Sequence, residues 1–326
     1  AGKAYVVLIV RNQMELPFPS DILQMTAVTV PMLLTENKAL DPLDVLRTIA
    51  ITDGIPELVR LFDFQRTFAE NLGLLFTQNS TYFRYAESEL RRHFRTPETY
   101  NILLYGMATG HNRISQLAEF SGFPQNKCDK YLKTLDKVGL LETVQRKDTA
   151  GHVRTHYYPK GGYWKTWFRY VFPSQGRYMK PLEGDSLQQL ADDIDRTIVS
   201  EYFKTVCWKW MRKNYGDYYW DEILRFDDPK QRDITVNGVH FDYVQETKDH
   251  TIYVKIWDDI REGFPKAEFQ KIETVTTKNR PFYENIYFLF SAGRACNYVE
   301  ELRNLETVSV VDLKSLLGQK NKELFG

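Results

Sequence analysis

The amino-acid sequence predicts a mixed α and α/β protein made of several domains, and three observations support this fold class. A continuous apolar run at residues 5–10, YVVLIV, is typical of a parallel strand buried on both faces. Residues 96–158 contain three helix patterns followed by two β-rich runs. Residues 186–326 mix strand and helix patterns, which indicates a separate α/β domain.

The segment that follows the first strand reads mainly as helix. A short β run, TAVTV, spans residues 26–30, and an amphipathic helix pattern follows the N-cap residue Asp41 and its neighbouring proline. This helix stops at Gly54, and Pro56 begins the next one. Taken alone, the Gly-Ile-Pro segment is only a helix stop followed by a helix start.

Residues 96–158 are the most informative stretch. A capped helix begins at TPE, a second helix reads RISQLAEFSG, and a third reads PQNKCDKYLKTLDKVG. The β-rich runs LLETVQR and HVRTHYY then flank the turn KDTAG. Three helices and a β-hairpin in this order predict a winged helix, a module that binds nucleic acid or a protein partner.

The remaining chain gives weaker local signals. The aromatic run GGYWKTWFRYVFP at residues 161–173 is dense enough to form an interdomain seam, and residues 175–185 are turn-rich. A long helical pattern covers residues 187–214. Asn237-Gly238 is a strong two-residue hairpin signal, and the chain ends in a helix–strand–helix pattern.

Composition excludes several classes of protein. The 43 basic residues balance the 43 acidic ones, which argues against wholesale coating of nucleic acid but allows a local basic face. The three cysteines are widely spaced and the six histidines lack ligand spacing, so we expect neither a metal site nor a disulfide framework. A reducing, cytoplasmic location fits best. No apolar run approaches the ~18 residues of a membrane span.

The chain begins at Ala1 rather than Met, next to the apolar strand. This start suggests that the chain was cut from a longer protein, and a tag remnant is the alternative explanation.

The motif ITDGIPELVRLFD at residues 51–63, together with NLGLLF, SELRRHFRTPETYNILLYGMATG and YLKTLDKVGLLETV, resembles the C-terminal half of a family of prokaryotic AAA-type ATPases. In that family a lid with a Gly-Gly-x-Pro motif precedes a winged helix and a nuclease-like domain. The resemblance is strong through residues 40–172. It implies the end of the ATPase core at 1–35, a helical lid at 36–95, a winged helix at 96–172, a linker at 173–185 and a nuclease-like α/β domain at 186–326.

The resemblance also implies nucleotide-binding positions. Asn12 falls near the polar position that senses the γ-phosphate, and Gly54 and Pro56 match the lid motif, with Asp53 where the family has its first glycine. The turn would place Arg60 near phosphate, although a surface salt bridge is the plainer role for this arginine. ATP and Mg²⁺ are therefore implied for the parent ATPase. No GxxxxGK[ST] loop occurs, so we expect this chain alone to need no cofactor and to hydrolyse no ATP.

The third helix of the winged module has a polar face. Cys128, Tyr131, Leu132 and Leu135 have the spacing of its buried side. The residues left outside, with those of the wing, are candidates for contacting double-stranded DNA: Gln125, Asn126, Lys127, Lys130, Lys133, Lys137, Arg146, Lys147, His152 and Arg154. Residues 96–160 hold nine Lys and Arg against six Asp and Glu, a mild bias of +3. A solvated helix face on a docking module explains the same pattern.

The C-terminal domain resembles a restriction-endonuclease-like fold. The resemblance implies Glu201, Asp242 and Lys255 as its catalytic positions, but Tyr253 stands where the second carboxylate is needed. We therefore expect a degenerate domain without a bound metal. Glu246 or Asp249 could supply the missing acid, and an ion pair between Asp242 and Lys255 is the structural alternative, a contact worth little.

The function that these observations favour is the C-terminal part of an AAA-type ATP-binding protein, with a winged helix that binds DNA or a partner. The alternative is a protein-interaction scaffold that docks a partner or forms a homo-oligomer and binds no nucleic acid.

Overall fold

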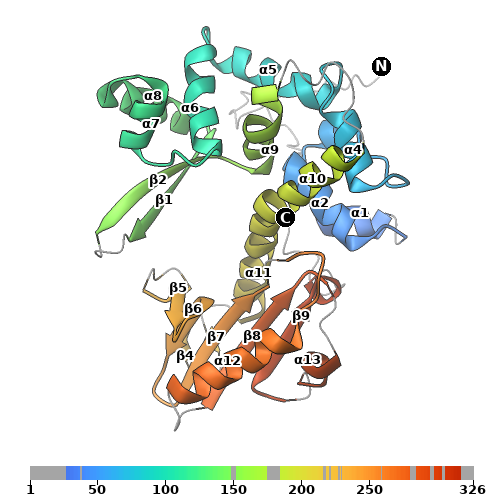
Figure 1. Cartoon of the computed structure of the whole chain (residues 1–326), viewed down its shortest axis with the longest axis vertical. Helices are drawn as coiled ribbons and strands as arrows, with labels where there is room; N and C mark the ends of the chain where they lie inside the picture. The colour runs from blue at the N-terminus through green and yellow to red at the C-terminus, as the bar shows by residue number, and fades with distance from the viewer. Residues whose placement is uncertain are drawn as a thin grey trace, which may run out of the picture.

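Figure 1 shows the computed structural model of the chain. It describes residues 27–36, 39–147, 152–174, 184–215, 218–219, 222–226, 228, 230–257, 259–279, 284–293, 297–302 and 305–316. The predicted strand at residues 5–10 and Asn12 lie outside these ranges. The described chain is mixed α and β, as predicted: a helical part with a projecting hairpin lies at one end, and a sheet domain lies at the other (Figure 1).

The N-terminal helices are α1 (Val30–Glu36), α2 (Pro42–Thr52), α3 (Pro56–Val59), α4 (Phe68–Leu75) and α5 (Thr81–His93). Residues next to the helix ends determine where the helices begin. At α2, for example, the Asp41 carboxylate accepts a hydrogen bond from the Leu43 N–H at 2.8 Å and caps the helix. The β run predicted at residues 26–30 is wrong, since helix α1 already begins at Val30. A proline follows Val30, and proline favours the first turn of a helix over the interior of a strand.

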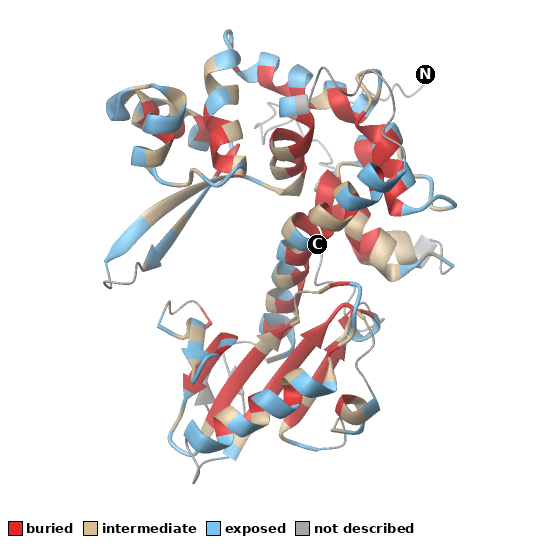
Figure 2. Cartoon of the chain, in the orientation of Figure 1, coloured by how far each residue is buried: buried red, intermediate tan, exposed pale blue. Residues whose placement is uncertain are grey.

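Residues 98–159 form a unit that we call the helix–hairpin unit. It contains α6 (Glu98–Ala108), α7 (Ile114–Ser121), α8 (Gln125–Lys137), β1 (Leu141–Lys147) and β2 (Val153–Pro159). The two strands pair antiparallel from Leu141↔Pro159 to Lys147↔Val153. Every helix and strand that the sequence predicted here is confirmed. Figure 2 shows the outer half of the hairpin exposed, whereas the three helices bury their inner faces.

The aromatic seam, residues 161–173, begins with α9 (Gly162–Thr166) and continues as the π-helical turn η1 (Trp167–Val171) and the short helix η2 (Phe172–Ser174). The Tyr163 hydroxyl donates to the Tyr82 carbonyl at 2.8 Å, and the Trp167 indole N–H donates to the Phe83 carbonyl at 3.2 Å. The seam therefore packs against α5, and the polar groups of its buried Tyr and Trp rings have hydrogen-bond partners there. Buried Tyr and Trp side chains usually need such partners.

A nearly continuous helix joins the two ends of the molecule. It runs through α10 (Asp185–Ile194), the π-helical turn η3 (Asp195–Val199) and α11 (Ser200–Tyr215). Asp195 is buried and accepts two hydrogen bonds from the Arg47 guanidinium of α2, at 3.0 and 2.7 Å. This forked ion pair fixes the helix against the N-terminal helices. Of the predicted linker, residues 175–183 lie outside the described chain.

The C-terminal domain is built on a five-stranded sheet of order β5-β6-β7-β8-β9. Its elements are β5 (Arg232–Val236), β6 (Val239–Glu246), β7 (His250–Ile256), α12 (Lys266–Asn279), β8 (Glu284–Ser291), α13 (Asn297–Glu301), β9 (Val308–Asp312) and α14 (Leu313–Leu316), with a separate pair β3 (Tyr218–Tyr219) and β4 (Glu222–Ile223). The first three strands pair antiparallel and the last three parallel. Asn237 and Gly238 both have positive φ, which confirms the predicted hairpin turn.

Each face of this sheet has its own apolar core. Tyr243, Val254 and Ile256 pack with residues of α11 on one face. Phe241 and Tyr253 pack with residues of α12 on the other face. Phe241 and Tyr243 are two residues apart on one strand and nevertheless face opposite cores. The alternation of β6 therefore breaks at Asp242, as it does at a bulge.

Candidate nucleic-acid interface

Helix α8 carries its polar residues on the side away from the core of the helix–hairpin unit. Cys128, Leu132 and Leu135 are buried. The exposed residues include Gln125, Asn126, Lys130, Lys133 and Lys137, and Lys127 is partly exposed. The structure thus leaves the predicted helical candidates outside the core of the unit. Gln125, Asn126 and Lys127 lie in the first turn of α8, where donors can reach phosphate groups, and Lys137 is its last residue.

Two of these lysines already have partners within the unit. The Lys133 ammonium lies 2.7 Å from the Asp129 carboxylate, one turn away. The Lys127 ammonium lies over the Phe123 ring, 3.9 Å from its centroid, and 5.7 Å from that of Tyr131. A nucleic acid would compete with these contacts for the two charges. Lys130 and Lys137 carry the more available charges of the helix.

One face of the hairpin carries two arginines and a histidine. Because directly paired residues of antiparallel strands share a face, the register places Glu142, Val144, Arg146, Arg154, His156 and Tyr158 together. We call this side the wing face. The Arg146 guanidinium lies over the Tyr158 ring, 5.7 Å from its centroid. The other hairpin face holds Gln145 and Thr155, which hydrogen-bond to each other at 3.0 Å, and the side chain of Lys147 lies outside the described atoms.

A third arginine approaches the wing face from the turn before α7. The Tyr157 N–H donates to the Asn112 carbonyl at 2.8 Å, and the Asn112 side-chain amide donates to the Tyr157 carbonyl at 3.1 Å. These bonds hold the turn, and with it Arg113, against strand β2. Partial burial and the positive charges of Arg146 and Arg113 lower the pKa of His156. His156 therefore has the positive charges of two arginines in its surroundings.

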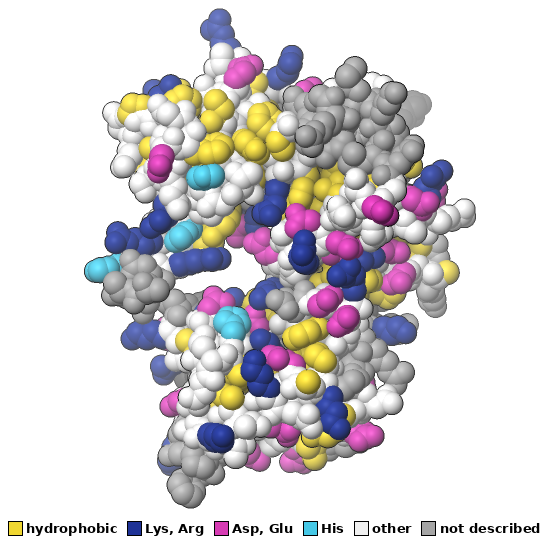
Figure 3. Space-filling model, in the orientation of Figure 1, with side chains coloured by type: hydrophobic (Ala, Val, Ile, Leu, Met, Phe, Trp, Pro, Cys, Tyr) yellow, Lys and Arg dark blue, Asp and Glu magenta, His cyan; other side chains and the backbone are white. Residues whose placement is uncertain are grey.

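The base of the wing face is attached to the rest of the chain. The Lys165 ammonium of α9 lies 3.4 Å from the Glu142 carboxylate of β1 and 2.8 Å from the Glu201 carboxylate of α11. It also lies 5.7 Å from the centroid of the Tyr158 ring. Figure 3 shows Lys, Arg and His side chains along the hairpin, beside an opening between the hairpin and the C-terminal domain.

The predicted nucleotide-binding residues of the lid lie on the turn between α2 and α3. Gly54 has a φ of +67° and a Cβ there would lie 2.0 Å from the Val28 carbonyl oxygen, so only glycine fits. Pro56 begins α3, and Arg60 ends it as an exposed residue. Arg60 forms no ion pair with any other residue that the structure describes, so the salt bridge offered as its plainer role is not seen.

Asp53, immediately before this glycine, contacts the aromatic seam. Its carboxylate accepts hydrogen bonds from the Gly162 N–H at 2.7 Å and the Tyr163 N–H at 3.1 Å, at the first turn of α9. Burial raises the pKa of Asp53 to about 6, although the two N–H groups and Lys165 favour the ionised form. Asp53 therefore joins the turn between α2 and α3 to the first turn of α9.

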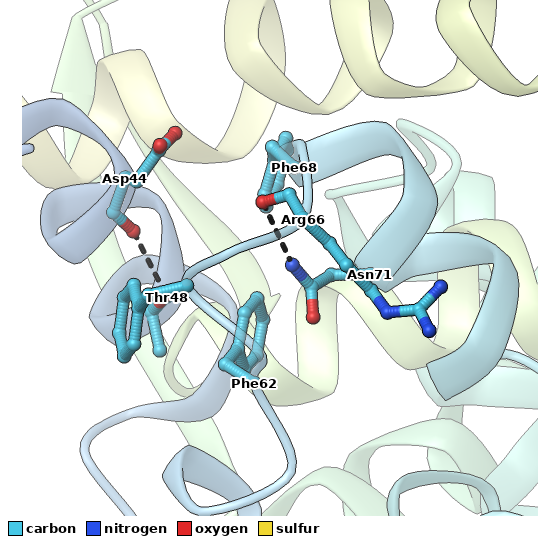
Figure 4. A pocket seen from close by; sticks show the side chains of 7 residues that line it. Asp44, Thr48, Phe62, Arg66, Phe68 and Asn71 are labelled. Atoms are coloured by element: carbon cyan, nitrogen blue, oxygen red, sulfur yellow. Dashed lines mark hydrogen bonds between the residues drawn. The ribbon is translucent and has the colours of Figure 1, made fainter.

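A small pocket lies beside the lid turn, between α2 and α4 (Figure 4). It is lined by Asp44, Thr48, Phe62, Phe64, Arg66, Phe68 and Asn71. Its volume is about 10 Å³, close to the least that one water molecule needs. The Asn71 amide is occupied by the backbone of Asp63, to which it donates at 2.9 Å. The pocket as it stands is too small for a nucleotide base.

The three nuclease-like candidates are not brought together. Asp242 is buried, its carboxylate lies 2.9 Å from the Lys204 ammonium of α11, and it accepts from the Ile256 N–H at 2.7 Å. Lys255 faces α12 instead: its ammonium donates to the His240 carbonyl at 2.8 Å and lies 3.8 Å from the Glu268 carboxylate. Asp242 and Lys255 therefore do not form the ion pair offered as an alternative.

Glu201 points elsewhere, since its carboxylate is bound to Lys165. Tyr253 is buried on the α12 side, stacked with Tyr287 at 5.8 Å between ring centroids. Glu246 pairs with Thr251 near the turn of the β6–β7 hairpin, four residues or roughly 13 Å along the strand from Asp242. Among the described residues, no group of three or more His, Cys, Asp or Glu side chains is placed to hold a metal ion.

Sequence reasoning missed four residues that organise these sites: Asp53 as a cap of α9, Arg113 beside the wing, Lys165 at its base and Lys204 on Asp242. A charged side chain in a helix pattern was the only signal for the two lysines. Their partners lie 36 residues apart for Lys165 and Glu201 and 38 for Lys204 and Asp242, so no local pattern indicates them.

Comparison with known proteins gives a limited result. No family model matches the chain. A stretch of 136 residues is 26% identical to the uncharacterized protein MJECL04 of Methanocaldococcus jannaschii, and it covers 40% of this chain and 30% of that protein. This identity and coverage do not define a family. Within the described residues, no helix combines the length and the apolar character needed to span a bilayer.

Proposed function

We propose that this chain is the C-terminal part of an AAA-type ATPase and that its helix–hairpin unit is a winged helix that binds double-stranded DNA. The observation that carries the DNA part is the presence of exposed basic side chains on α8 and on the wing face of the same unit. Lys130 and Lys137 lie on the helix, and Arg146 and Arg154 lie on the hairpin. Such residues contact phosphate groups from a winged module.

The ATPase part rests on the resemblance of the lid and on the way its turn is built. Position 54 must be glycine, because a Cβ there would clash with the Val28 backbone. The Asp53 carboxylate binds the Gly162 N–H and so links this turn to α9. In this proposal a preceding segment supplies the phosphate loop that binds ATP and Mg²⁺. The chain alone is then expected to release no phosphate from ATP in the presence of Mg²⁺, and measurable release would contradict the proposal.

The C-terminal domain is, in the same proposal, a nuclease-like fold without activity. Its support is the partner of Asp242. The Lys204 ammonium, and not a metal ion, is the cation that this carboxylate binds, at a distance of 2.9 Å. The Lys255 side chain, which would have to position the attacking water, faces the opposite side of the sheet. Incubation of a supercoiled plasmid with the chain and Mg²⁺ or Mn²⁺ should leave the plasmid intact, and cleavage lost in Asp242→Ala would overturn this part.

A filter-binding titration at ~50 and ~200 mM salt tests the DNA part. For about three phosphate contacts the affinity should fall roughly 40-fold between these conditions, because bound phosphates release counterions. No retention at the lower salt, or an affinity that salt leaves unchanged, would show that the unit does not bind DNA.

A protein-docking role is the second candidate, and a separate observation favours it. Ile102 of α6 and Phe120 of α7 are each 36% exposed, although both are large apolar residues. Exposed apolar side chains of this size are typical of surfaces that contact proteins when they lie together. A molar mass that rises with concentration, without retention of DNA, would favour the scaffold over the DNA-binding role.

A further inference from the structure

The wing face places one titratable group among fixed positive charges. His156 lies opposite Val144, next to Arg154 on its own strand and diagonal to Arg146 on the paired strand. Neighbours on one face of a hairpin lie about 5–8 Å apart, so both guanidinium groups are within electrostatic reach of the imidazole. His156 is half-buried, and water therefore screens these charges less than it does at the hairpin tip.

The other elements packed against this strand add to the positive field. Arg113 lies at the turn held to β2 by Asn112. Lys165 lies at the base of the face, over the Tyr158 ring, and its charge is balanced by Glu142 and Glu201. In the free protein the imidazole thus faces an excess of positive charge, and the neutral form of His156 is favoured.

We propose that His156 takes up a proton when a nucleic-acid phosphate group binds to the wing face, so that the chain binds DNA more tightly as the pH falls. This inference rests on the proposed DNA-binding function. The phosphate neutralises the arginine charges and offers an acceptor for the imidazole N–H, and both effects favour imidazolium. The proton comes from solvent, and no bond of the nucleic acid is broken.

The direction of the effect follows from linkage. Partial burial, together with the positive charges of Arg146 and Arg113, lowers the pKa of His156 in the free protein. A bound phosphate group offsets the charge contribution, and the pKa of His156 then rises. The complex therefore holds more protons than the free protein in the pH range between the two pKa values. Within that range affinity increases as pH falls, and the increase is about tenfold for each unit by which binding raises the pKa.

The test is fluorescence anisotropy with a labelled duplex of about two helical turns, from about pH 8 to about pH 5.5 at constant ionic strength. The chain should gain about tenfold more affinity over this range than the variant His156→Asn. His240→Asn is the matched control, because His240 is an exposed histidine of strand β6, outside the helix–hairpin unit. It should keep the pH dependence of the unmodified chain.

Equal pH dependence in the unmodified chain and in His156→Asn would overturn the inference while leaving DNA binding in place. No binding at any pH at low salt would overturn both the inference and the proposed function. If His156→Asn does not fold, titration of the His156 ring protons by NMR with and without duplex decides the question. A pKa that does not rise on addition of duplex refutes the coupling.

Discussion

The hairpin β1–β2 and the sheet β5–β9 both contain charged residues that are candidate site residues from the sequence. The hairpin exposes its arginines to solvent, whereas the sheet buries Asp242. On the hairpin, Arg146 and Arg154 are exposed, and they share a face with His156. In the sheet, Asp242 is 4% exposed and is bound on both oxygens, by the Lys204 ammonium and by a backbone N–H.

The difference is one of exposure: the guanidinium groups of Arg146 and Arg154 lie at the surface, whereas the Asp242 carboxylate is enclosed. An exposed arginine beside other cations can exchange water for a phosphate group at little cost. A buried carboxylate with a lysine and an N–H as partners is shielded from solvent, and breaking its contacts destabilises the fold. Exposed candidate residues can therefore bind a ligand, whereas buried ones stabilise the fold. Substitutions should change the free energy of unfolding little at the first kind and strongly at the second.

The largest effect should come from Asp242→Ala. The substitution removes the buried carboxylate that accepts hydrogen bonds from the Lys204 ammonium and the Ile256 N–H, and we expect a loss of about 3 kcal/mol in the free energy of unfolding. Urea unfolding followed by tryptophan fluorescence measures it. Asp249→Ala, at an exposed turn residue, is the control and should change stability by less than about 0.5 kcal/mol. A loss as small as that of the control would mean that Asp242 is not held as the structure shows.

Asp53 extends the comparison, because its carboxylate is partly buried and is held chiefly by backbone N–H groups. Its pKa is raised from 3.8 to about 6 in the folded chain, so the folded state binds more protons than the unfolded state between these values. The stability contributed by the protonated carboxyl is complete below about pH 4 and is lost as pH rises through about 6. The expected loss is on the order of 2–3 kcal/mol.

The measurement is the unfolding free energy of the chain and of Asp53→Asn between about pH 4.5 and about pH 7.5. An amide cannot ionise, so the variant should lack this part of the pH dependence, whatever constant penalty its altered hydrogen bonds add. Parallel pH profiles for the two proteins would be incompatible with a raised pKa at Asp53.

The smallest effect on stability should come from Lys130→Ala combined with Lys137→Ala on α8. Both side chains are exposed, and we expect a change within about 0.5 kcal/mol for each. DNA affinity should nevertheless fall at low salt, and the slope of log affinity against log salt should drop by about one per lysine. Lys248→Ala, at the exposed turn of β6–β7, should alter neither quantity. A stability loss with unchanged DNA affinity would place these lysines among the structural residues.

Much of the fold was predictable, because it depends on short-range signals. The proline starts of α2 and α3, the Asn237-Gly238 turn and the three helices of the helix–hairpin unit follow from the residues within one turn. The error at residues 26–30 has the same origin. Alternating valines indicate a strand by propensity, but the proline that follows Val30 favours a helix start, and the helix wins.

The sites were less predictable, because they depend on which face of an element a residue occupies. The side chains of α8 could be assigned to a face from helical spacing alone. The break in alternation at Asp242 sends it toward α11, whereas Lys255 faces α12, and strand spacing cannot indicate this break. Likewise, nothing near Asp53 in sequence shows that its partners are the N–H groups of residues 109 and 110 positions later.

The bond between Asp53 and α9 has a mechanical consequence. Strand β2 ends at Pro159 and α9 begins at Gly162, which binds Asp53. The turn after α2 is thereby connected to the hairpin directly through α9, without passing through α3 to α8. The hairpin acts as an arm of seven residues, roughly 24 Å long. A tilt of about 5° at its base would move the tip by about 2 Å, the scale of domain rearrangements on binding. A slight displacement of the Asp53 turn is thereby amplified at the wing.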